Sequence, residues 1–159
     1  MPENNHYGSR LSHLHLPRVC VAVFGSDAAQ LIEKAESIVR DNTFIEFRLD
    51  YIARPALALS RIKEFTEFHP HITVIATCRR AASGGKFQGS IAAQVEILAK
   101  AAAAGCQLID IELQTAMRLK PAQLDKLRSK AAIILSFHDF RATQKLDETL
   151  KKMASREAS

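Results

Sequence analysis

The sequence has few cysteines and no long apolar or basic run, and each of these shortages excludes a class of protein. Its cysteines, Cys20, Cys78 and Cys106, are odd in number, far apart and set in apolar segments. We therefore expect buried free thiols in a reducing compartment, the cytoplasm, and neither a disulfide framework nor a zinc site. No apolar stretch approaches the ~20 residues that a membrane-spanning helix needs, so we expect no membrane partner.

The basic charge is spread along the chain and does not form a stripe. Lys and Arg outnumber Asp and Glu by 22 to 17, which gives a net charge of +5 and an isoelectric point near 9.3. No basic run is longer than Arg79-Arg80 or Lys151-Lys152, and aromatic residues do not alternate with the basic ones. We therefore expect no nucleic-acid partner, and attraction of a small anionic substrate explains the charge equally well.

The first residues are polar and lack the charged-then-apolar order of a signal peptide. His6, His13 and His15 lie among them at irregular spacing, which favours a flexible N-terminal arm over residues 1–16 rather than a metal site. Residues 17–159 are enough for one domain with a sizeable core.

Short apolar runs alternate with helical patterns throughout this domain. The expected strands, all buried, are Val19–Phe24, Phe44–Leu49, Ile72–Thr77, Leu108–Leu113 and Ala131–Ser136. Helices are expected after Asp27, from Pro55, after Ser90 up to Gly105, from Pro121, and from Leu146 to about Arg156. Strands and helices that alternate with short connections predict a parallel sheet with right-handed crossovers.

Two α/β architectures fit this order of elements. An open, doubly wound sheet would suit the length of the chain, and periodicity alone favours it. A (β/α)8 TIM barrel needs typically ~250 residues, so this chain would supply only about the first five of eight βα units. The charged residues at the strand ends favour the barrel.

Glu46, Arg48 and Asp50 alternate with apolar residues, which puts the three charges on one face of a strand. Asp110-Ile111-Glu112 repeats this pattern two strands later. On a barrel strand such a face points inward, where charges form a network or meet a ligand. An edge strand with one solvated face is the alternative.

Arg79 and His138 follow the third and fifth expected strands. Because α/β enzymes keep their chemistry at the carboxyl ends of parallel strands, we expect one site there. Its candidate residues are Glu46, Arg48, Arg79 and His138. A structural histidine is the alternative for His138, and a surface salt bridge is the alternative for Arg79.

Four segments together resemble type I 3-dehydroquinate dehydratase in order and spacing, from about Pro17 to the end of the chain. They are Glu46-x-Arg48-x-Asp50, Thr77-Cys78-Arg79 with Gly84-Gly85, Asp110-Ile111-Glu112-Leu113-Gln114 and Ser136-Phe137-His138-Asp139-Phe140. The resemblance implies the N-terminal part of a (β/α)8 barrel. It also implies a shikimate-pathway lyase that dehydrates 3-dehydroquinate to 3-dehydroshikimate through a lysine Schiff base, with no metal or organic cofactor.

The same resemblance implies a role for each candidate residue. His138 corresponds to the general acid/base, and an imidazole that titrates near neutrality suits that work. Glu46 and Arg48 correspond to a substrate-contacting pair, and Arg79 to a second arginine that reaches the substrate. The planar guanidinium group supplies several fixed donors to a polyhydroxylated carboxylate.

The chain departs from the family pattern in two ways that matter for chemistry. Ser83 stands where most of the family has a glutamate that steadies the histidine, and a serine cannot stabilise an imidazolium by charge. The family's imine-forming lysine lies on a sixth strand, and the sequence ends at Ser159, before that strand. Lys145, Lys151 and Lys152 lie in a loop or on a helix, where solvated amines are poor nucleophiles.

We therefore expect the isolated chain to be inactive. A barrel cut after its fifth unit leaves strand edges open, so we also expect aggregation or a homodimer joined through these edges. Two other functions stay open: a non-catalytic partial barrel that binds a ligand or a partner chain, and an open-sheet α/β ligand-binding protein.

Overall fold

The computed structural model describes residues 16–140, 142 and 145–157. The expected arm of residues 1–16 therefore lies almost entirely outside the described residues. Five strands form one parallel sheet in the order β1-β2-β3-β4-β5. They are β1 (Val21–Val23), β2 (Phe44–Arg48), β3 (Thr73–Thr77), β4 (Leu108–Glu112) and β5 (Ala132–Ser136). Each strand pairs with the next along the chain, as in successive units of a barrel, whereas a doubly wound sheet reverses its order at a switch point.

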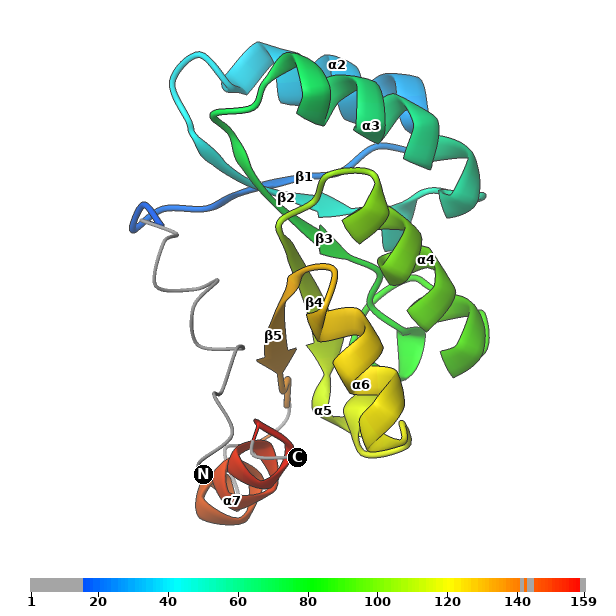
Figure 1. Cartoon of the computed structure of the whole chain (residues 1–159), viewed down its shortest axis with the longest axis vertical. Coiled ribbons are helices and arrows are strands. Elements are labelled where there is room, and N and C mark those ends of the chain that lie inside the picture. Colours follow the sequence, from blue (N-terminus) through cyan, green and yellow to red (C-terminus); the bar gives the residue numbers. More distant parts are fainter. Residues whose placement is uncertain (1–15, 141, 143–144, 158–159) are drawn as a thin grey trace, which may run out of the picture.

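The helices α2, α3, α4 and α6 lie on one side of this sheet (Figure 1). The helices are α2 (Ala28–Ile38), α3 (Leu59–Phe68), α4 (Ile91–Ala103), α5 (Leu113–Ala116), α6 (Pro121–Arg128) and α7 (Leu146–Glu157). Short 3-10 turns are η1 (Leu49–Tyr51), η2 (Pro55–Ala58) and η3 (Ala81–Ser83). The sequence did not predict α5 or these turns. In the described part of the chain, no helix combines the length and the apolarity needed to cross a bilayer.

Short-range signals fix the ends of two helices. The Asp27 carboxylate accepts a hydrogen bond from the Gln30 N–H at 2.9 Å and caps α2. The Ser90 hydroxyl accepts one from the Ala93 N–H at 3.1 Å and caps α4. These bonds satisfy N–H groups that have no partner within the helix. The chain then leaves α4 at Gly105, whose φ of +98° lies in the region that favours glycine.

The two faces of the sheet carry different side chains. The outer face packs against the helices, and Ile45, Phe47 and Ile109 are fully buried there. A second, smaller apolar cluster consists of Phe44, Ile75 and Leu108 with Ala132 and Ile134 packed against it. Because side chains alternate along a strand, this cluster marks the inner face. Toward the carboxyl ends, the inner-face positions become polar.

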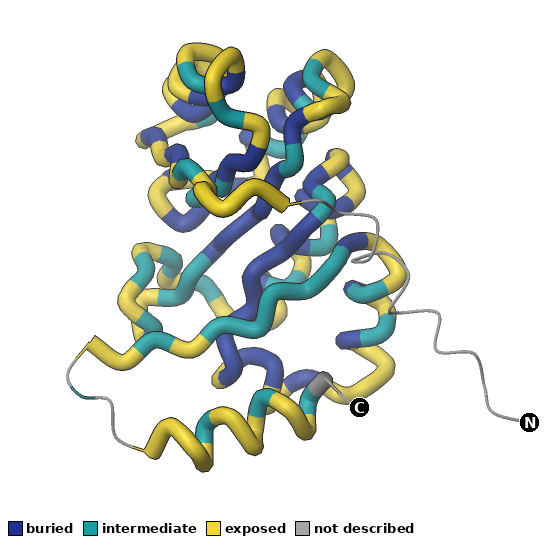
Figure 2. The backbone as a smooth tube through the Cα atoms, turned by 90° about the vertical axis from the view of Figure 1, so that its left-hand side faces the viewer, coloured by how far each residue is buried: buried dark blue, intermediate teal, exposed yellow. Residues whose placement is uncertain are grey.

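The two edge strands are less buried than the sequence predicts. Val19 and Phe24, expected inside the first strand, flank β1 and are 68% and 50% exposed. The β5 strand, expected to be buried on both faces, is half-buried along its whole length (Figure 2). Each of these strands pairs with a neighbour on one side only within the described sheet. Local apolarity therefore overestimates their burial.

Two further predictions need correction. Cys20 is exposed, whereas Cys78 and Cys106 are buried as expected. Burial raises the pKa of the Cys78 and Cys106 thiols to about 12, which suppresses the reactive thiolate. The helix expected from Pro55 begins later, at Leu59, because Pro55 opens the 3-10 turn η2, and Leu57 in that turn is exposed.

Candidate active site

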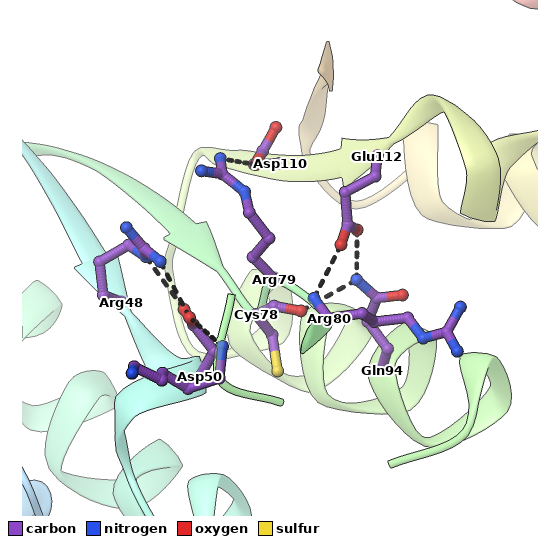
Figure 3. Close-up of polar contacts among 9 residues, drawn as sticks. Arg48, Asp50, Cys78, Arg79, Arg80, Gln94, Asp110 and Glu112 are labelled. Atoms are coloured by element: carbon purple, nitrogen blue, oxygen red, sulfur yellow. Dashed lines mark hydrogen bonds and ion pairs between the residues drawn. The ribbon is translucent and has the colours of Figure 1, made fainter. Parts of the chain in front are cut away.

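Polar side chains on the inner face line up across the sheet at the carboxyl ends of its strands. In the strand register, Arg48 lies opposite Thr77, and Thr77 lies opposite Asp110. Two residues beyond Asp110 on β4, Glu112 lies opposite Ser136 of β5. Neighbouring strands are about 4.8 Å apart, so this register brings polar groups from four strands to one edge of the sheet. Figure 3 shows this edge.

Arg48 is held by the carboxylate of Asp50. Its Nε and Nη2 atoms donate to Asp50 Oδ1 and Oδ2 at 3.0 and 2.9 Å, a bidentate pair (Figure 3). The backbone N–H of Lys86 donates to the same carboxylate at 3.1 Å. Asp50 lies in η1 rather than on the strand, so the expected alternation ends at Arg48. Hydrogen bonding to Asp50 raises the pKa of Arg48, and the guanidinium group lies 5.0 Å from the centre of the Tyr51 ring.

Arg79 is paired with Asp110, on the next strand of the sheet. Its Nη2 atom lies 2.8 Å from Asp110 Oδ2, and the two side chains are only 14% and 6% exposed. The ion pair considered for Arg79 therefore exists, but it is largely buried rather than on the surface. The neighbouring Arg80 side chain extends away from Asp110 (Figure 3).

His138 lies just beyond β5, close enough to Arg48, Arg79, Asp110 and Glu112 for their charges to change the pKa of its imidazole. Burial lowers the pKa of its imidazole, and the positive charges of Arg79 and Arg48 lower it further. The negative charges of Asp110 and Glu112 act in the opposite direction. The net result is a histidine whose pKa lies below its usual value of about 6.5.

The ring of Phe140 stacks on His138, with centroids 6.0 Å apart and planes at 21°. Phe140 also covers Gly84, where a Cβ atom would lie 2.2 Å from the Phe140 ring. Gly84 has a φ of +80° and directly follows Ser83, which ends η3. An aromatic contact thus joins His138 to the loop that contains Ser83 and Gly84.

Glu46 is half-buried on β2, opposite Ala22 on one side and Ile75 on the other. Burial, together with the negative charge of Glu46, raises the pKa of Cys20 to about 11, and the same charge adds a small upward contribution to the pKa of Arg48 beside that of Asp50. Glu46 thus lies near Arg48, as expected, but also toward the exposed β1 edge.

Several buried polar atoms at this edge have no hydrogen-bond partner among the described residues. They are Thr77 Oγ1, Arg79 Nε, Asp110 Oδ1, Ser136 Oγ and His138 Nδ1. All five lie at or near the carboxyl ends of β3, β4 and β5. Buried polar groups normally have partners, so this set can donate to and accept from a polar ligand. Among residues 16–140, 142 and 145–157, no three His, Cys, Asp or Glu side chains are placed to hold a metal ion.

The sequence did not predict the full set of hydrogen-bond partners of four residues that shape this edge. Asp50, Asp110 and Glu112 belong to the quoted motifs, but their partners lie up to tens of residues away in sequence. Gln94 was not singled out at all, although it is fully buried in α4. The available signal was its place on the apolar face of that helix, three residues after Ile91 and three before Ile97.

Comparisons with known proteins show the family and the fold of the chain. Residues 19–159 match the model of the type I 3-dehydroquinase family. A 3-dehydroquinate dehydratase of Coxiella burnetii (strain RSA 493 / Nine Mile phase I) is 33% identical over 135 residues, which are 85% of this chain and 54% of that protein. One from Dehalococcoides mccartyi (strain CBDB1) is 33% identical over 150 residues, which are 91% of this chain and 61% of that protein.

Solved structures show the same fold. The 3-dehydroquinate dehydratase of Geobacillus kaustophilus HTA426 superposes with a TM-score of 0.76 at 21% identity, covering 91% of this chain and 58% of that one. The type I enzyme of Clostridium difficile gives 0.73 at 22% identity, covering 89% and 59%. The chain thus spans little more than half the length of these relatives. With its strand order, strand-end motifs and family match in agreement, the chain belongs to the type I 3-dehydroquinase family.

Proposed function

We propose that this chain provides the substrate-binding and acid–base part of a 3-dehydroquinate dehydratase site. The observation that carries the proposal is the grouping of two arginines and a histidine at one edge of the sheet. Each arginine is neutralised by its own aspartate, Arg48 by Asp50 and Arg79 by Asp110. Arginine donors beyond those pairs remain for a carboxylate or hydroxyl group of the substrate.

In the reaction that we propose, His138 moves the protons. An imine to a lysine acidifies the neighbouring C–H group of the substrate, and the neutral imidazole removes that proton. The released electron pair forms the carbon–carbon double bond, and the hydroxyl group on the next carbon leaves as water with a proton from the imidazolium. The lowered pKa of His138 supports this role, because the imidazole must be neutral near pH 7 to act as the base.

The imine-forming amine is not supplied by the strands described. None of the five strands contains a lysine. Lys145, Lys151 and Lys152 are exposed around α7, and Lys86 is exposed in the loop after η3, 6.0 Å from the centre of the Tyr51 ring. The absence of a strand lysine among the described residues favours a second function for the isolated chain, a partial barrel that binds a ligand without converting it.

Calorimetric titration of the chain with 3-dehydroquinate tests the binding role. We expect Arg48→Ala and Arg79→Ala each to weaken binding by about 10- to 100-fold, the value of one charged hydrogen bond. Arg40→Ala is the matched control, since that side chain is 90% exposed beyond α2 and should leave the affinity unchanged. If all three variants lose affinity equally, or if the first two lose none, Arg48 and Arg79 do not bind the substrate.

Borohydride reduction in the presence of 3-dehydroquinate tests whether the chain forms an imine with the substrate. A lysine imine would be trapped as a stable secondary amine and located by mass spectrometry. We expect no adduct and no turnover from the 159-residue chain. An adduct on Lys86, or on one of the lysines around α7, would show that another amine performs the covalent step.

A further inference from the structure

A buried amide side chain joins α4 to the end of β3. Gln94 is fully buried, and both polar atoms of its side chain have partners, of which Figure 3 shows those of Nε2. Its Nε2 group donates to the carbonyl oxygen of Cys78 at 2.9 Å and also to the carboxylate of Glu112. Its Oε1 atom accepts from the hydroxyl of Thr115 at 2.9 Å. A buried side chain with this many satisfied polar contacts has one orientation only.

Glu112 is the second member of this network. It is 2% exposed at the end of β4, and its carboxylate oxygens have different partners. Oε2 accepts from Gln94, and Oε1 accepts from the backbone N–H of Arg80 at 2.8 Å. A buried carboxylate is costly unless such donors satisfy it, so the network and the backbone at Arg80 stabilise each other.

The two contacts to backbone atoms lie on either side of Arg79. The carbonyl group of Cys78 precedes Arg79, and the N–H group of Arg80 follows it. The carbonyl oxygen of Arg79 itself accepts from the N–H of Phe87 at 3.0 Å. Both peptide planes that define the direction of the Arg79 side chain are therefore held by hydrogen bonds.

We propose that Gln94 and Glu112 are positioning residues that fix the direction in which Arg79 leaves β3. With its backbone held in this way, the guanidinium group meets Asp110 and directs its remaining N–H groups toward the inner face. A long side chain magnifies any rotation at its base, and a displacement of 1 Å in a site can cost about 100-fold in rate. The importance of this network for substrate binding rests on the proposed function. The positioning of Arg79 by Gln94 and Glu112 does not.

The opposite end of β3 offers a matched control. Gln107 also uses its amide on the backbone of this region, accepting from Val74 N–H at 2.8 Å and donating to the Ile72 carbonyl at 3.2 Å. Gln107→Leu and Gln94→Leu therefore remove the same kind of interaction from opposite ends of one strand. Only Gln94 lies beside Arg79.

NMR spectroscopy of the 159-residue chain tests the proposal through the Arg80 amide and the Arg79 Nε–Hε group. In Gln94→Leu we expect the Arg80 amide to exchange with solvent about tenfold faster, the effect of losing one net hydrogen bond. We expect the Arg79 signal to shift or broaden as well. In Gln107→Leu both signals should match the wild type, even if the melting temperature falls. Equal changes in the two variants, or no change in Gln94→Leu, would overturn the proposal.

If Gln94→Leu does not fold, the Thr115 variants give the answer. Thr115→Ser keeps the hydroxyl group that donates to Gln94, and Thr115→Val removes it with little change of shape. We expect Thr115→Val to perturb Arg79 and Arg80 and Thr115→Ser to restore them. Identical spectra for the two variants would contradict the positioning of Arg79 by Gln94 and Glu112.

The same samples are then titrated with 3-dehydroquinate. We expect Gln94→Leu to weaken binding by about tenfold and Gln107→Leu to leave it unchanged. If the wild-type chain binds no 3-dehydroquinate, the proposed function fails. The Arg79 and Arg80 signals still decide whether Gln94 and Glu112 position Arg79.

Discussion

Arg79 and Asp110 form a largely buried ion pair between the ends of neighbouring strands, with 2.8 Å between Nη2 and Oδ2. The pair leaves Arg79 Nε and Asp110 Oδ1 without partners among the described residues. Each residue thus has polar capacity beyond the pair itself. Such an arrangement keeps a guanidinium group in a partly dry site and leaves donors for a ligand.

Removing the acid of this pair is expected to destabilise the fold. Asp110→Ala leaves the Arg79 charge buried and uncompensated, and we expect the free energy of unfolding to fall by about 3–5 kcal/mol. The pKa of His138 should fall as well, because the Asp110 charge raises it. Urea unfolding and NMR titration measure the two effects. Glu96→Ala, which breaks the exposed pair with Lys100, should leave the stability nearly unchanged, because solvent screens an exposed ion pair.

The pH dependence of stability follows from the lowered pKa of His138. The unfolded chain binds this proton more readily than the folded one. The contribution of His138 is therefore fully present above its unfolded pKa of about 6.5 and is lost as the pH falls toward the lower folded pKa. We expect His138→Gln to remove that part of the acid-induced loss. A measured folded pKa above 6.5 would reverse the sign of this effect, and one well above 7 would contradict an imidazole that is mainly neutral at pH 7.

Gly84 is expected to control the contact between Phe140 and His138. At its φ of +80° an alanine costs roughly 1–2 kcal/mol, and the added Cβ would collide with the Phe140 ring. We expect Gly84→Ala to lower stability and, by displacing Phe140, to raise the pKa of His138 toward its usual value. Gly105→Ala is the control, since it also has a positive φ but lies at the end of α4. A pKa of His138 that shifts equally in both variants would mean that Phe140 does not shield it.

How far the sequence predicts this molecule depends on the range of the interactions involved. Asp27, Ser90 and Gly105 act within one helical turn, and the helix ends that they mark were predicted within a few residues. The apolar runs likewise located all five strands. The exposure of Cys20 and the half-burial of β5 depend on which elements cover the inner face, and a local pattern does not contain that information.

The candidate site shows the same limit. Strand-end motifs placed Arg48, Arg79 and His138 at one edge, because parallel strands bring their carboxyl ends together. The partner of Arg79 is 31 residues away, and Gln94 bonds to residues 16 to 21 positions away. Those contacts follow from the register of β3 and β4 and from the packing of α4, which the sequence pattern leaves undetermined.

The open edges are expected to govern self-association. Since β1 and β5 each have one described neighbour, their free backbone groups can pair with another chain. We expect sedimentation to show dimers or larger species. Ile134→Lys places a charge on the inner face of β5 and should reduce association, whereas Phe68→Ser, on α3, should not. A monomer with slow amide exchange in both edge strands would contradict this expectation.

The most direct test of the proposed site is an NMR titration of the His138 imidazole with 3-dehydroquinate, with acetate as a control for simple carboxylate binding. We expect 3-dehydroquinate to shift the His138 and Arg79 signals together and in a saturable manner, to raise the pKa of His138 through the added negative charge, and to remain unconverted. Acetate should produce much smaller shifts. If His138 and Arg79 do not respond to 3-dehydroquinate, or respond to acetate equally, this edge of the sheet is not the substrate site.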